Sequence, residues 1–87
     1  RSQHPEILPD LSEIEFDGAD LIGIDLSRVN LCRSSLRWAA LIGANLSEAK
    51  LNKAVLHQTK FINANLRSAE FIDASLIGAN FRDADLS

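Results

Sequence analysis

The chain has 87 residues and a net charge of −3, so it lacks the basic balance of proteins that bind nucleic acid or anionic membranes. Hydrophobic residues make up 46% of the sequence, which excludes a disordered chain, and no apolar run approaches the ~20 residues of a membrane-spanning helix. Cys32 is the only cysteine and excludes an internal disulfide. The length predicts one domain.

Residues 1–8 differ from the rest of the chain because they follow no repeat. This segment begins with Arg1 instead of Met, and it carries Ile7 and Leu8 next to Pro9. Stacked repeats need covered ends, so we expect residues 1–8 to fold over the first repeat as a cap. The start at Arg1 is also consistent with a removed targeting signal or with a fragment of a larger protein.

Residues 9–87 follow a period of five. Every fifth residue from Leu11 to Leu86 is Leu or Phe, sixteen in all, and two residues before each lies a second residue that is mostly Ala. An amphipathic helix needs apolar spacings of three and four, and a strand needs strict alternation, so neither element buries both series. A coil that turns once per five residues directs both series inward and three residues outward.

Residues 44–46, 64–66 and 84–86 read Ala-Asn-Leu, Ala-Asn-Leu and Ala-Asp-Leu. They resemble the A-[DN]-L-x-x consensus of the pentapeptide-repeat family, and the resemblance extends over residues 9–87. It implies an all-β fold, a right-handed quadrilateral β-helix in which four pentapeptides make a coil of twenty residues, and hence about four coils. Inward side chains would then stack in ladders twenty residues apart, such as Leu21, Leu41, Phe61 and Phe81.

The glycines mark one position of the repeat, two residues after the Leu/Phe position. Because glycine adopts positive φ readily, we interpret this position as the corner at which the coil turns, and not as a ligand site. The glycines at this position are Gly18, Gly23, Gly43 and Gly78.

Two exterior features are candidate interaction surfaces. The first is an apolar patch around three isoleucines that share one face and a tryptophan at the adjoining corner, because exposed apolar patches and Trp are typical of binding surfaces. The alternative is that isoleucine stands there for its β propensity. The patch comprises Ile22, Trp38, Ala40, Ile42 and Ile62, with Val55 on the next face, where Ile77 also lies. The second is the uncapped last coil, a candidate for end-to-end stacking through Phe71, Leu76, Phe81 and Leu86.

The other exterior columns are polar. On one face we expect ion pairs between Arg33 and Glu13 and between Lys53 and Asp73, each worth ~0–1 kcal/mol. On another face Asp or Asn recurs with the twenty-residue period, and we expect these residues to stabilise turns through bonds to the neighbouring backbone. This column is Asp25, Asn45, Asn65 and Asp85.

Catalytic patterns are absent from the sequence. His4 precedes the repeat, and His57 and Cys32 are outward positions on which the periodic map brings no partner for nucleophilic catalysis. Phosphate-binding loops and metal-ligand spacings are also missing. We therefore expect no cofactor, no metal and no enzyme activity.

The sequence predicts a non-enzymatic rigid scaffold that presents a surface to another protein or to a second copy of itself, without a small-molecule substrate, nucleic acid or membrane insertion. The resemblance implies one alternative, a DNA-mimicking protein that binds gyrase, although Arg28, Lys50 and Arg67 interrupt any acidic stripe. The other alternative is a regulatory module of a larger protein. We expect a cytoplasmic location, or a thylakoid or other lumen if a targeting signal was removed; the resembled family is abundant in cyanobacteria.

Overall fold

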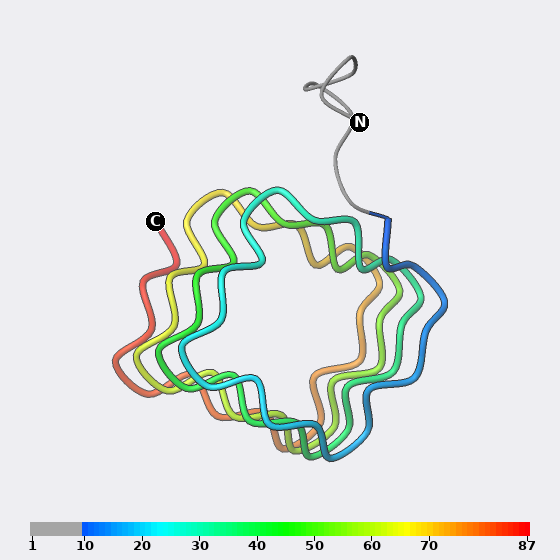
Figure 1. Cartoon of the computed structure of the whole chain (residues 1–87), viewed down its shortest axis with the longest axis horizontal. Helices are drawn as coiled ribbons and strands as arrows, with labels where there is room; N and C mark the ends of the chain where they lie inside the picture. Colours follow the sequence, from blue (N-terminus) through cyan, green and yellow to red (C-terminus); the bar gives the residue numbers. More distant parts are fainter. Residues whose placement is uncertain (1–9) are drawn as a thin grey trace.

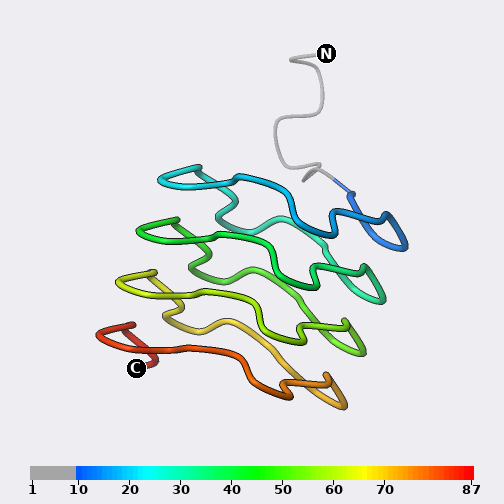
Figure 2. The same cartoon turned by 90° about the horizontal axis from the view of Figure 1, so that it is seen from below.

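The computed structural model describes residues 10–87, so the predicted cap at residues 1–8 lies outside the described residues. The chain winds into stacked coils that superimpose when viewed end on (Figure 1) and separate into layers when viewed from the side (Figure 2). We number them coil 1 (residues 10–29), coil 2 (residues 30–49), coil 3 (residues 50–69) and coil 4 (residues 70–87).

Isolated parallel bridges join each coil to the next. Every bridge connects residues twenty positions apart, from Asp10 with Asn30 to Asn65 with Asp85, which confirms the expected period. Within residues 10–87 these bridges are not extended into continuous strands, and no helix is present that is long and apolar enough to cross a membrane. The predicted stack of parallel coils is present, and it is joined by single bridging residues in place of longer strands. The chain turns every five residues, which leaves one bridging residue between successive turns.

Backbone hydrogen bonds run along the stack and hold the coils in register. The Phe16 N–H donates to the Ser35 carbonyl at 2.7 Å, and the Ser35 N–H donates back to the Ile14 carbonyl at 3.0 Å. A third bond runs from the Gly18 N–H to the Arg37 carbonyl at 2.7 Å. The same three bonds recur along the stack, so each inner coil satisfies its backbone polar groups through both neighbours.

The corner of each pentapeptide is a tight turn with one left-handed residue. The Ala19 N–H donates to the Phe16 carbonyl at 2.9 Å across such a turn, and the third turn residue, Gly18, has φ of +73°. A positive φ at the third residue is the signature of a type II turn. The corner predicted from the glycines is confirmed, but eleven non-glycine residues adopt the same conformation at φ between 58° and 63°.

The interior is filled by the two inward series, which are almost completely buried in coils 2 and 3. The predicted ladder is present: the Phe61 and Phe81 rings stack with centroids 4.9 Å apart, and Phe71 packs edge-on against Phe61 at 6.2 Å. The two polar members of the small series are satisfied, because the Ser34 and Thr59 hydroxyls donate to backbone carbonyls at 2.7 and 2.6 Å. No buried polar side-chain atom in the described part lacks a partner.

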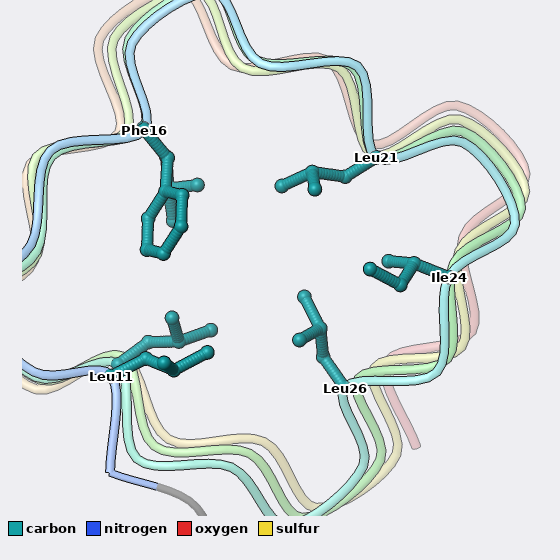
Figure 3. A pocket seen from close by; sticks show the side chains of 7 residues that line it. Leu11, Phe16, Leu21, Ile24 and Leu26 are labelled. Atoms are coloured by element: carbon teal, nitrogen blue, oxygen red, sulfur yellow. The ribbon is translucent and has the colours of Figure 1, made fainter.

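The first coil opens onto an apolar pocket of about 80 Å³ on the axis (Figure 3). The side chains of Phe16, Leu21 and Ile24 point into it, and Leu31 and Leu36 of coil 2 also line it. Most inward residues of coil 1 are consequently half-buried or exposed, whereas Leu26, Val29 and the inward residues of coil 2 are buried.

The left-handed corner predicts opposite effects for two neighbouring lysines. Lys53 has φ of 62°, and an L-residue there costs ~1–2 kcal/mol relative to the right-handed conformation. Lys53→Gly relieves this strain, so it should leave the free energy of unfolding unchanged or raise it. Lys50→Gly, at an exposed bridging position, should lower it by ~0.5–1 kcal/mol. Denaturant unfolding of both variants checks this; an equal loss would contradict it.

The stacked interior predicts that leucine truncation depends on the coil. Leu46 is 0% exposed and Leu86 is 58% exposed, although both occupy the same repeat position. Leu46→Ala should lower the free energy of unfolding by ~2–5 kcal/mol through the cavity that it leaves. Leu86→Ala in the same chain should cost less than ~1 kcal/mol. Similar losses for the two variants would show that the ladder is not cooperatively packed.

Candidate interaction surface

Each pentapeptide presents three side chains to solvent: the bridging residue and the two central residues of the turn. The twenty-residue register stacks equivalent side chains into columns parallel to the axis. The exterior is therefore a grid in which a residue's position in the sequence fixes both its side and its height.

One side of this grid carries the apolar patch predicted from the sequence. Ile22 and Trp38 are 58% and 59% exposed, while Ile42, Ile62 and Ala40 are half-buried. We call these five residues the Ile/Trp face. Beside Ile42 the surface is bare, because a Cβ placed on Gly43 would meet no atom within 4 Å.

Trp38 is exceptional among the corner residues. It has φ of 59°, a conformation that is unusual for a bulky residue. The other ten non-glycine residues with positive φ in residues 10–87 are all polar or charged. Trp38 therefore combines a strained backbone with an indole that stays mostly in water, and neither property stabilises the coil.

Val55, which the sequence grouped with this patch, lies in a different column. It bridges Ser35 and Ser75 and is half-buried, one side away from the isoleucines. Ile77 on that next face is 68% exposed, and Ile72, which the sequence analysis did not include, is 65% exposed; both lie on coil 4. Both stand at the first turn position, where a count of outward residues identifies them.

The predicted stacking surface consists of inward residues of coil 4. Leu76 and Leu86 are 38% and 58% exposed, whereas Phe71 and Phe81 are half-buried and pack on Phe61. These side chains follow the interior ladders to the last described coil, so their exposure arises at the end of the stack and not on a lateral side.

The expected ion pairs between Arg33 and Glu13 and between Lys53 and Asp73 are wrong. Ion pairs within residues 10–87 are Arg67 with Asp85 at 3.8 Å and the sequence neighbours Arg82 and Asp83 at 3.9 Å. Side chains twenty residues apart share a column, but several of those that bond are eighteen apart. Three such pairs form between adjacent coils: Asn52 with Glu70, Asp17 with Ser35, and His57 with Ser75.

The Asp/Asn column stabilises turns, as predicted. The Ser27 N–H and hydroxyl donate to the Asp25 carboxylate at 3.0 and 2.7 Å, and Asp85 receives the same two bonds from Ser87. The bonds from Ser27 lower the pKa of Asp25. The pKa of Asp17 is also lowered, chiefly by the Ser35 hydroxyl of the next coil.

These carboxylates predict sensitivity to acid. A folded-state pKa below the ordinary 3.8 means that the unfolded chain binds more protons, so stability is retained above about pH 4 and is lost as pH falls through the lowered pKa values. Asp17→Asn, which keeps an acceptor oxygen but cannot titrate, should flatten the fall in melting temperature between pH 5 and pH 2, in roughly the range set by these groups. Glu48→Gln is the control, and an equal effect from it would contradict the assignment.

His57 has a partner that the sequence did not reveal. Its Nε2 lies 2.6 Å from the Ser75 hydroxyl, yet within residues 10–87 no carboxylate bonds to the other ring nitrogen to orient the imidazole. Cys32 is a half-buried free thiol, and His4 lies outside the described residues. In the described part, no three His, Cys, Asp or Glu side chains converge into a metal site.

The chain is similar to known proteins in sequence and in structure. The family profile described as Pentapeptide repeats matches in eight copies over residues 10–48 and 49–87. A pentapeptide repeat protein from Nostoc has a similar crystal structure, with 30% identity and a TM-score of 0.56 over 99% of this chain and 71% of that chain. No curated protein sequence matches the chain.

Two further solved structures are similar. A pentapeptide repeat protein from the thylakoid lumen of Arabidopsis thaliana is 31% identical with a TM-score of 0.40, over 88% of this chain and 64% of that chain. QnrB1, a plasmid-mediated fluoroquinolone resistance protein, is 22% identical with a TM-score of 0.48, over 86% of this chain and 39% of that chain. The profile match and the five-residue period agree over residues 10–87: the chain belongs to the pentapeptide-repeat family.

Proposed function

We propose that this protein is a non-enzymatic scaffold that binds another protein through the Ile/Trp face. The observation that carries the proposal is Trp38, the one large apolar side chain among the left-handed corners of the described residues. Large exposed aromatic side chains are the usual anchors of protein interfaces, and they contribute once a partner removes them from water.

The neighbourhood of Trp38 supports this function. Ala40 and Ile42 follow it along the same coil, and Ile22 and Ile62 extend the apolar surface to the coils on either side. A rigid backbone adds to affinity because little conformational entropy is lost when such a surface binds. The four turns in each twenty-residue period also support the quadrilateral shape of the coil that the family resemblance implies.

The charged columns give no support to DNA mimicry. A mimic of duplex DNA needs acidic side chains that continue along the rod, because the phosphates that it replaces are continuous. Here the bridging column that begins with Asp20 continues through Ala40 to Lys60, and the column that begins with Asp10 reaches Lys50.

The proposal predicts that Trp38→Ala removes partner binding. The experiment immobilises the 87-residue chain and measures which proteins it retains from an extract of the source organism. Loss of a hot-spot side chain costs at least ~2 kcal/mol, so retention of specific partners should fall roughly thirtyfold. Ile42→Glu should have the same effect by placing a charge in the apolar surface.

Glu48→Ala is the matched control, because Glu48 also has φ of 59° but lies on another corner. Both variants place alanine in the same left-handed conformation, so circular dichroism should show equal folding. Equal retention by the wild type, Trp38→Ala and Ile42→Glu would remove the Ile/Trp face as the binding surface.

A further inference from the structure

The Ile/Trp face is self-complementary in charge. The bridging column that crosses it reads Asp20, Ala40, Lys60 and Asn80, with successive members paired as parallel bridges, and its first three members belong to coils 1, 2 and 3. Asp20 and Lys60 are both exposed, and neither forms an ion pair among the described residues. Opposite charges therefore stand one coil above and one coil below a small apolar centre.

This arrangement matches itself under one symmetry operation. If two rods pack face to face and antiparallel, with a two-fold axis crossing coil 2 at Ala40, each column lies against its own copy in reverse order. Asp20 then faces Lys60 of the second copy, and Lys60 faces Asp20 of the second copy. A two-fold interface of this kind repeats every contact twice.

The apolar residues follow the same symmetry. Ile22 is placed opposite Ile62 of the second copy, while Ile42 and Trp38 each meet their own equivalents. Gly43 also faces itself, so no side chain separates the two surfaces next to Ile42. The contact has an apolar centre and charged pairs at either end, the usual composition of a protein interface.

We propose that the Ile/Trp face binds a second copy of this chain, in an antiparallel two-fold dimer held by Ile42 and Trp38 and oriented by two Asp20–Lys60 pairs. This inference rests on the proposed function and names its partner. A parallel dimer about the same column would place Asp20 against Asp20 and Lys60 against Lys60, and like charges in contact are repulsive.

The opposite side of the rod does not combine these features. The column with Asp10 and Lys50 has the same charge order, but an antiparallel contact there would set Arg33 against Arg33 and would bury mainly polar groups. Among the described sides, only the Ile/Trp face has opposite charges on either side of an apolar centre.

The area of the face sets the strength of the dimer. The chain exposes 5213 Å², and one lateral side is less than a quarter of this because both ends also contribute. A standard interface buries ~800 Å² on each partner, so the face accommodates an interface at the lower end of the range. Association should therefore depend on concentration and on salt.

Charge reversal tests the orientation. D20K or K60D alone turns both attractive pairs into repulsive ones and should weaken self-association by at least roughly tenfold in sedimentation equilibrium at low salt. An equimolar mixture of the D20K and K60D chains should associate again, because every pair is then of opposite sign. The double variant D20K/K60D should associate like the wild type.

K50D is the matched control, since Lys50 occupies the equivalent bridging position of coil 3 on the opposite side, and it should leave self-association unchanged. A monomeric wild type at millimolar concentration, single variants that associate normally, or a mixture no stronger than its components would overturn the proposal. If the chain is monomeric but Trp38→Ala still loses partners from the extract, the dimer fails while the proposed function stands.

Discussion

The whole structure depends on one backbone constraint, a left-handed residue at every fifth position. This residue turns the chain so that the next pentapeptide lies on a new side of the coil. After four such turns, twenty residues later, the chain lies above its starting position in the next coil. Only then can the Phe16 N–H reach the Ser35 carbonyl, and only then do Phe61 and Phe81 stack on the axis. The hydrogen-bond ladder and the apolar core are thus consequences of the same turn.

The same constraint separates the residues that determine the fold from those that are free to bind. Inward residues are limited to what the axis accommodates, whereas outward residues have only to tolerate water and, at the corner, a positive φ. At all the remaining corners of residues 10–87 a polar residue or glycine satisfies both conditions. Trp38 satisfies neither condition well. An exposed residue that the fold does not require is the best available indication of a surface with another purpose.

The period of five predicted the interior, the corners and the ladder from Leu21 to Phe81, because these depend on one repeating side-chain size. It did not predict the side-chain bonds between coils. Asp17 bonds Ser35 and Asn52 bonds Glu70 because the turn residue of one coil leans toward the bridging residue of the next, a spacing of eighteen that a comparison of columns does not include. The period also did not predict how exposed each side chain is. Ile22 and Ile62 share a column, but Ile22 is more exposed because coil 1 has no described neighbour above it.

In a rod with a fixed register, the sequence separation of two exposed residues determines their relative positions on the surface. Successive coils lie ~4.8 Å apart, so residues separated by twenty or forty positions stand at set heights on one side. Asp20 and Lys60 are forty residues apart and hence two coils apart, with Ala40 midway between them. A flexible surface could bring such charges together in several ways, each with an entropic cost. On this rigid grid one antiparallel alignment pairs both charges at once. A shift by a single coil breaks both pairs, because one charge then lies opposite Ala40 and the other lies opposite Asn80 or beyond the first described coil. The register that folds the chain therefore also supplies the specificity of the contact.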